Sequence, residues 1–378
     1  MKRLTLLIVV CLGWAGSATG LDHVVLRRDG KQVSVDGRLL VTAQDGGLLV
    51  LARDGVLWAV PPEEQLKHSS DELPFKPLSR EEMSKRLLAE LPQGFDVHQT
   101  TNYLICYNTS RAYAQWCGAL FERLYRAFTN YWQNKGFDLS EPEFPLVAIV
   151  FADQRSYTEF AKAELGDAAR SIIGYFSLRT NWMTTYDLTG MEALSRFGGR
   201  RGTTAQINRI LARPEALRTV ATIVHEATHQ IAFNCGLHAR YSDCPVWLSE
   251  GIALYFETPD LGSTKGWSGI GAVNPPRLAR FREYLKRRPP DSLQTLLADD
   301  ERFHDPQQSL DAYAEAWSLT YFLIRQHSKQ YVAYLNVLSQ KKPLLDDGPQ
   351  TRLEEFQRAF GDLKQLDAEF LRYMLGIR

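Results

Sequence analysis

The 378-residue sequence predicts an α+β protein in which a mixed sheet is followed by a helical lobe, with a small β-meander in front. Asp-Gly pairs recur between residues 23 and 60, and short apolar runs separate them. Strand and helix patterns alternate between 95 and 188, and after Pro245 the apolar residues fall mostly at helical spacing. A chain of this length can bury a large core and still carry an accessory module.

The β-meander is expected over residues 21–62. Its four Asp-Gly pairs begin at residues 29, 36, 45 and 54, with runs such as LLVLA between them and VLWAV after the last. Asp-Gly readily adopts the positive φ angles of tight hairpin turns, so the pairs predict hairpins. Two prolines at 61–62 end the meander, and the polar stretch 63–80 is expected to be a linker.

A larger domain is expected over residues 81–340, followed by a C-terminal helical extension over 341–378. Pro214 suits the first turn of a helix that ends near Asn234, with Gly236 as its stop. The strand and helix patterns that indicate the earlier part of the domain lie at 95–109, 110–132, 144–151 and 174–188.

The first 20 residues have the pattern of a secretory signal peptide. Two basic residues precede an apolar run from Leu4 to Trp14, and the small residues AGSATG follow. The run is too short to span a membrane, so we expect a soluble protein exported to the periplasm or beyond the cell. Lys plus Arg and Asp plus Glu both number 44, and this zero net charge gives no electrostatic reason to expect nucleic acid or an anionic membrane as a partner.

Four cysteines remain after the expected signal, namely Cys106, Cys117, Cys235 and Cys244. An even number in an oxidising compartment is compatible with two disulfides, and proximity in the sequence favours Cys106–Cys117 and Cys235–Cys244. The alternative is that the cysteines are buried free thiols. No CxxC spacing occurs, which argues against a cysteine zinc site.

The stretch TIVHEATHQIAFNCG, residues 222–236, contains a candidate metal site. His225 and His229 are four positions apart, so on a helix they project from one face and both imidazoles can reach one ion. Glu226 is offset to the side, where it could contact a metal-bound water without being a ligand. The alternative is a core helix with a polar face, whose histidines are satisfied by hydrogen bonds.

A third ligand is expected in PVWLSEGIALYFE, residues 245–257. Two histidines and one glutamate form a standard zinc-binding set, and Glu250 lies 21 residues after His229 (250 − 229). This spacing leaves room for the first helix to end, for a turn, and for a second helix that brings Glu250 opposite the histidines. Gly251 and Ala253 are small and permit close helix packing beside the site.

These two segments resemble the gluzincin metallopeptidases, the peptidase MA-like class that includes thermolysin and the zinc aminopeptidases. The resemblance consists of HExxH followed at this distance by W-L-x-E-G-x-A, here Trp247 to Ala253. The wider stretch is similar to a bacterial family of exported, uncharacterised peptidase-like proteins. The resemblance covers roughly residues 140–330 and implies a gluzincin-like catalytic domain that binds one Zn²⁺ through His225, His229 and Glu250.

A less specific match, AYAEAWSLTYFLIRQ at 312–326, resembles the aminopeptidase helix whose tyrosine stabilises the transition state. It implies that Tyr313 donates a hydrogen bond to the developing oxyanion. One alternative is that Tyr313, Trp317 and Tyr321 form an aromatic stripe in the core. Another is that His304 is the donor.

The sequence departs from the zinc aminopeptidases in one segment. Their G-x-M-E-N motif holds the amino group of the substrate, whereas TGMEALS at 189–195 has no asparagine after Glu192. Exopeptidase specificity is therefore not supported. The resemblance also implies that a strand within 174–188 lies beside the site and offers its edge to an extended peptide.

Residues around the two motifs carry further expectations. Glu257 lies on the same helical face as Glu250 and is the candidate outer partner of a zinc-bound histidine, with a solvated carboxylate as the alternative. His238 and Asp243 are expected at the surface of the connecting turn. The basic cluster at 277–288 is expected to be a solvated helix face.

The resemblance implies zinc-dependent hydrolysis of peptide bonds in which Glu226 is the general base. Together with the signal-peptide pattern, it makes an exported, monomeric zinc peptidase the leading expectation. Two other functions stay open. One is a non-catalytic binding or scaffold protein that keeps the fold, and the other is a zinc hydrolase of a non-peptide amide or ester. The intact Glu226 favours a catalytic protein, because a binding protein does not need the base.

Overall fold

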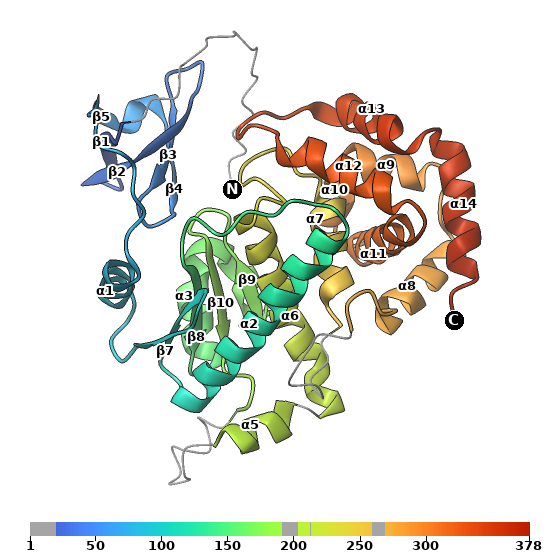
Figure 1. Cartoon of the computed structure of the whole chain (residues 1–378), viewed down its shortest axis with the longest axis horizontal. Coiled ribbons are helices and arrows are strands. Elements are labelled where there is room, and N and C mark those ends of the chain that lie inside the picture. The colour runs from blue at the N-terminus through green and yellow to red at the C-terminus, as the bar shows by residue number, and fades with distance from the viewer. Residues whose placement is uncertain (1–19, 191–202, 212, 259–268) are drawn as a thin grey trace.

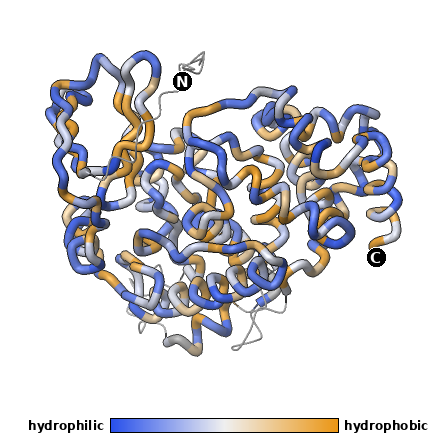
Figure 2. The backbone as a smooth tube through the Cα atoms, turned by 45° about the horizontal axis from the view of Figure 1, so that its top comes forward, coloured by the Kyte–Doolittle hydropathy of each residue, from blue (hydrophilic) through white to orange (hydrophobic). Residues whose placement is uncertain are grey.

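The computed structural model describes residues 20–190, 203–211, 213–258 and 269–378, which form two sheets and a large set of helices (Figure 1). This mixed architecture agrees with the α+β class that the sequence predicts. Hydrophobic segments run through the interior, and hydrophilic turns lie outside them (Figure 2). Residues 1–19 of the expected signal peptide lie outside the described ranges.

The N-terminal sheet is the expected β-meander enlarged by one strand. Its five antiparallel strands have the order β4-β3-β2-β1-β5. The strand that enlarges it, β5, lies within the segment expected to be a linker, where the chain returns to pair with the free edge of β1. The elements are β1 (Asp22–Arg28), β2 (Lys31–Thr42), β3 (Leu48–Ala52), β4 (Leu57–Val60), the short 3₁₀ turn η1 (Pro62–Glu64) and β5 (Gln65–Ser70).

Three of the four Asp-Gly pairs lie in turns between strands. Gly30, Gly46 and Gly55 have positive φ angles of 75°, 89° and 83°. The pair that begins at Asp36 lies instead inside β2. A β-carbon at Gly37 would lie 2.4 Å from the carbonyl oxygen of Leu51, so glycine there permits the close approach of β3 rather than a turn.

The second sheet is mixed and has the order β6-β7-β8-β10-β9. Strands β7, β8 and β10 are parallel, whereas the edge strands β6 and β9 are antiparallel to their neighbours. The parallel strands are almost wholly buried, because helices cover both faces. The bounds are β6 (Asp96–Gln99), β7 (Tyr103–Tyr107), β8 (Leu146–Phe151), β9 (Gly174–Phe176) and β10 (Trp182–Tyr186).

Helices α2 and α6 cover one face of the second sheet, and α1 and α3 cover the other. Alternation along β7 separates the two faces: Tyr103 and Ile105 pack with α2, and Leu104 and Cys106 pack with α1 and α3. The bounds are α1 (Arg80–Glu90), α2 (Arg111–Asn134), α3 (Gln154–Leu165), η2 (Gly166–Arg170), α5 (Thr204–Leu211) and α6 (Pro214–Asn234).

The two expected disulfides are wrong, because all four of these cysteines are free thiols. Cys106 faces α1 and α3, whereas Cys117 of α2 lies on the opposite face of the sheet. Cys244 packs beside His238, with 3.5 Å between Cys244 Sγ and His238 Nδ1, while Cys235 is enclosed in the main core. Burial raises the pKa of the Cys106, Cys235 and Cys244 thiols to about 12, so they stay protonated at neutral pH.

The remaining helices form a lobe in which α11 contacts both α7 and α8 (Figure 1). Most side chains of α11 are buried. Within the part of the chain that the structure describes, no helix combines the length and the hydropathy that a membrane span requires. The bounds are α7 (Val246–Phe256), α8 (Pro275–Leu285), α9 (Ser292–Ala298), α10 (Glu301–His304), α11 (Ser309–Gln326), α12 (Ser328–Ser339), α13 (Gly348–Phe360) and α14 (Leu363–Leu375).

Charged residues expected at the surface are buried in this lobe. Glu315 of α11 accepts a hydrogen bond from Arg288 Nε at 2.7 Å. Asp243 is 8% exposed and accepts a hydrogen bond from Arg352 Nε at 3.0 Å. The expectations of a solvated cluster at 277–288 and of a surface Asp243 are therefore wrong for Arg288 and Asp243. A charge can be buried where an opposite charge is buried with it.

Gly251 sets the distance between α7 and α11. A β-carbon built there would lie 2.1 Å from Thr320 Oγ1 and 2.9 Å from the carbonyl oxygen of Ala316. The expected close packing is therefore present, and it is made against α11. Because Glu250 directly precedes Gly251, this contact also determines where the Glu250 side chain begins.

We expect Gly251→Ala to lower the free energy of unfolding by about 1–3 kcal/mol, because the added methyl group forces α7 away from α11. Chemical denaturation of the variant beside the wild type measures the loss. Adding Thr320→Ala removes the nearest atom and should restore part of the stability. Equal stability of Gly251→Ala and the wild type would contradict the tight contact.

Candidate metal centre

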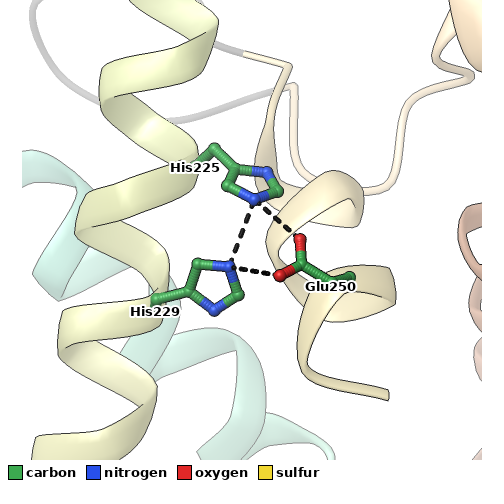
Figure 3. Close-up of side chains that lie close together, drawn as sticks. All are labelled: His225, His229 and Glu250. Atoms are coloured by element: carbon green, nitrogen blue, oxygen red, sulfur yellow. Dashed lines mark hydrogen bonds and ion pairs between the residues drawn. The ribbon is translucent and has the colours of Figure 1, made fainter. Parts of the chain in front are cut away.

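Helices α6 and α7 bring His225, His229 and Glu250 together (Figure 3). The Nε2 atoms of the two histidines are 3.1 Å apart, and Glu250 Oε2 lies 3.0 Å from His225 Nε2. Glu250 Oε1 lies 3.5 Å from His229 Nε2. One ligand atom from each residue thus lies within 4.8 Å of the others. Among the described residues, this is the one group of three or more metal-ligating side chains that converge so closely.

The local structure of both helices explains the convergence. The four-residue spacing directs both rings toward α7 (Figure 3). Helix α6 ends at Asn234, and Gly236, with a φ of 80°, lets the chain turn away. Helix α7 begins at Val246, whose backbone N–H donates to Asp300 Oδ1 at 3.0 Å. Since the first N–H groups of a helix have no partner within it, Asp300 caps α7 from another part of the lobe.

Glu257, at the end of α7, lies beside the outer nitrogen of His225. Its Oε2 is 3.5 Å from His225 Nδ1 and 3.9 Å from Arg277 Nη2. The Glu257 side chain is only 16% exposed, so it is not the solvated carboxylate that was the alternative. A histidine that binds a metal through Nε2 needs a partner at Nδ1 to fix the ring, and Glu257 occupies that position. Nothing in the sequence pattern links Arg277 to this group.

Glu226 projects beside the three residues and contacts the edge strand β9. Its Oε2 accepts a hydrogen bond from the backbone N–H of Phe176 at 3.0 Å. Burial raises the pKa of Glu226, while positive charge on His225 and His229 acts in the opposite direction. A carboxyl group with a raised pKa is a stronger base than an ordinary surface glutamate.

The charges of the cluster favour a cation. Burial lowers the pKa of His225, but hydrogen bonds with Glu250 and Glu257 outweigh burial and raise this pKa to about 10. Burial raises the pKa of Glu250, but the two histidines outweigh burial and lower this pKa. The carboxylates therefore attract positive charge at His225. A divalent ion can replace the proton there, because neutral imidazole nitrogens are metal ligands.

A cleft of about 470 Å³ opens onto the cluster, and Glu226 and Tyr313 line it together with the three converging residues. Burial raises the pKa of Tyr313, and the carboxylates of Glu250 and Glu226 raise it further, so the phenol keeps its proton. The other two members of the proposed aromatic stripe, Trp317 and Tyr321, pack in the core. Tyr313 thus differs from them in facing the cleft.

Two other described residues singled out in the sequence, His304 and His238, do not line this cleft. His304 lies on the exposed side of α10. His238 is 3% exposed and packs against Phe233, with 5.1 Å between the ring centroids, so the expectation of a surface position was wrong. The loop after α6 folds inward here, since Leu237 joins the main core and Asp243 pairs with Arg352 of α13. Glu192 lies outside the described residues.

The chain is similar, over residues 219–345, to a family described as a protein of unknown function (DUF1570). The matched segment contains both histidines, Glu250 and Tyr313, and leaves both sheets outside it. The comparison with curated proteins found no match. These comparisons assign no activity, so a function has to be argued from the residues of the site.

We expect the wild-type protein, produced without residues 1–20, to hold about one zinc ion per chain by mass spectrometry, and Glu250→Ala to retain much less, because only two ligands remain. Glu257→Gln keeps all three ligands and should weaken zinc binding by about 10–100-fold through loss of the charged outer partner. Glu159→Gln makes the same chemical change at an exposed position of α3 and serves as the control. Unchanged zinc content in Glu250→Ala would contradict this ligand set.

Proposed function

We propose that this protein is an exported zinc metallopeptidase of the gluzincin type that hydrolyses peptide bonds. The observation that carries the proposal is the convergence of His225, His229 and Glu250 on a cleft, with Glu226 beside them. The resemblance of the two surrounding segments to gluzincins supports it, and a mixed sheet followed by a helical lobe is compatible with it.

Zinc fits the donors that are present. Two imidazole nitrogens and one carboxylate oxygen are a set that catalytic zinc sites use. Their ligand atoms lie within 4.8 Å of one another, and Glu257 offers His225 an outer partner. When bound, zinc would polarise the substrate carbonyl and lower the pKa of a coordinated water to about 7.

Glu226 would act as the general base. Its carboxylate lies in the cleft and is held by the N–H of Phe176. It takes a proton from water as the water oxygen bonds to the carbonyl carbon of the substrate. It then donates this proton to the amine nitrogen as the carbon–nitrogen bond breaks. A raised pKa suits a group that must both accept and return a proton.

Tyr313 would donate a hydrogen bond to the carbonyl oxygen as negative charge develops on it. Its raised pKa keeps the donor protonated. Arg277 supports this role, because its guanidinium carbon lies 5.8 Å from the centroid of the Tyr313 ring and adds positive charge on that side.

The edge strand β9 supports a peptide as the substrate. Strand β10 pairs with one side of β9, and on the other side the N–H of Phe176 faces Glu226. An extended chain can add to a free strand edge through main-chain hydrogen bonds. Placed there, it would run past the metal ligands. We propose that the protein is a monomer and that it acts on its substrates outside the cytoplasm.

Glu226→Gln should lower kcat/KM for peptide cleavage by about 10²–10⁴-fold and leave bound zinc unchanged, because an amide cannot accept the proton. Incubation of a peptide library with the zinc-loaded protein, followed by mass spectrometry, provides the assay. Equal cleavage by wild type and variant would refute Glu226 as the base. Hydrolysis of amides or esters but of no peptide would favour the non-peptide hydrolase, and no hydrolysis at all would favour a binding protein.

Tyr313→Phe should lower kcat by about 10²–10³-fold with little change in KM, because the lost hydrogen bond forms mainly in the transition state. Tyr321→Phe removes a hydroxyl group from the same helix in the core and is the matched control. If both variants lose activity equally, the effect comes from helix packing and the oxyanion role is wrong.

A further inference from the structure

The N-terminal sheet contacts the rest of the molecule at the elements that wall the cleft (Figure 1). Leu178, in the turn between β9 and β10, and Tyr241, in the connection between α6 and α7, line the cleft beside the metal ligands. We call these two residues the outer wall. The N-terminal sheet and α6 both contact the outer wall or the turn that carries it.

The β9–β10 turn is fixed from two sides. From α6, Gln230 Nε2 donates to the carbonyl oxygen of Asn181 at 3.0 Å, and Asn234 exchanges side-chain hydrogen bonds of 2.8 Å with Asn181. From the N-terminal sheet, the N–H of Leu57 donates to the carbonyl oxygen of Arg179 at 2.8 Å. Strand β4 thus continues its main-chain hydrogen bonding onto the turn, which cannot shift without breaking these bonds.

Arg240 joins the sheet to the outer wall directly. Its Nη1 donates to the carbonyl oxygen of Gly55 at 2.9 Å and to that of Leu178 at 3.2 Å. Burial lowers the pKa of Arg240 to about 10, which leaves the guanidinium charged at neutral pH. Hydrogen bonds from a charged donor are stronger than those from a neutral one, so the two hydrogen bonds of Arg240 hold Gly55 and Leu178 in place.

Tyr241 is held in an uncommon backbone conformation. Its φ is 61°, a region that residues other than glycine adopt only where their surroundings enforce it. The carbonyl oxygen of Tyr241 accepts a hydrogen bond from the N–H of Leu344 at 2.7 Å. The side chain packs against a cluster formed by Leu49, Leu51, Leu57 and Phe144, of which the first three belong to the N-terminal sheet.

Apolar side chains line the cleft beside the outer wall. Phe176 stacks on Phe233, with ring centroids 5.9 Å apart, and both line the cleft. Leu178 is 36% exposed. Partly exposed aromatic and aliphatic side chains beside a polar, metal-binding cluster are the surroundings that a bulky apolar group of a ligand prefers.

We propose that the N-terminal sheet, acting through Arg240, fixes the outer wall of a pocket that selects a bulky apolar side chain of the substrate. The sheet then supports the substrate cleft from outside, since the residues that line the cleft come from other elements. Arg240 is a positioning residue, since it acts through Leu178 and Tyr241. This inference rests on the proposed function insofar as the ligand is a peptide bound at the metal.

Two dipeptide hydroxamates, one with a phenylalanine and one with an alanine side chain, test the pocket by calorimetry on the zinc-loaded protein. The wild type should bind the phenylalanine compound roughly ten-fold or more tightly. Arg240→Met loses both hydrogen bonds and should bring the affinity ratio, the affinity for the phenylalanine compound divided by that for the alanine compound, close to one. Arg240→Lys should give an intermediate affinity ratio. Arg38→Met is the matched control, because Arg38 bonds Glu143 at 3.1 and 2.8 Å in the same interface and does not line the cleft.

Equal affinities in the wild type, or equal loss of the ratio in Arg240→Met and Arg38→Met, would overturn the proposal. Hydroxamate binding does not require turnover. If the protein prefers the phenylalanine compound but cleaves no peptide, only the peptidase function is refuted. If the protein cleaves peptides but binds the two hydroxamates equally, only the proposed pocket is refuted.

Amide exchange of Leu57 tests the same contact without zinc or ligand. It should accelerate several-fold in Arg240→Met relative to Arg38→Met, because the turn that accepts its hydrogen bond loses a support. Unchanged exchange would also overturn the proposal.

Discussion

The contact between α6 and α7 is the constraint on which the site depends. It places two imidazoles and a carboxylate within hydrogen-bonding distance of one another in a largely enclosed position. Such a concentration of ionisable groups is unfavourable unless each finds a partner. With Glu226 and Glu257 beside the cluster, three carboxylates surround the two imidazoles. The surplus negative charge makes the cluster a receptor for a cation. The same contact leaves Glu226 facing the cleft, where it accepts a hydrogen bond from the N–H of an edge strand.

Buried ion pairs hold the elements that surround this contact. Glu315 of α11 accepts hydrogen bonds from Arg288 and Arg302, and Asp243 pairs with Arg352 of α13. Buried pairs add little net stability compared with apolar packing, but each has few geometries in which it is satisfied. They therefore fix how the helices of the lobe are positioned relative to one another. Through Asp243, the C-terminal helices hold the connection between α6 and α7, while Asp300 caps the start of α7.

The N-terminal sheet and the C-terminal helices approach the cleft from different directions. The sheet supports the β9–β10 turn and the side chain of Tyr241, and the segment before α13 supports the Tyr241 backbone through Leu344. The segment similar to DUF1570 contains the metal-binding cluster but not the N-terminal sheet or β9. A description of the site limited to that segment would therefore omit the hydrogen bond to Glu226 and the support of the outer wall.

The sequence by itself determined the features that depend on local spacing. Histidines four residues apart share a helix face, small residues beside Glu250 allow close packing, and Asp-Gly pairs turn the chain at three of four positions. Only the tertiary structure decided which distant groups meet. It separated Cys106 from Cys117 by a sheet, placed Gly37 inside a strand, added β5 to the first sheet, and buried Asp243, His238 and Arg288. It also brought Arg240 to Gly55 and Arg277 to Glu257. These contacts join residues far apart in the chain, and their geometry depends on how whole elements pack. A periodic pattern read along one segment carries no information about the partner that lies across the core.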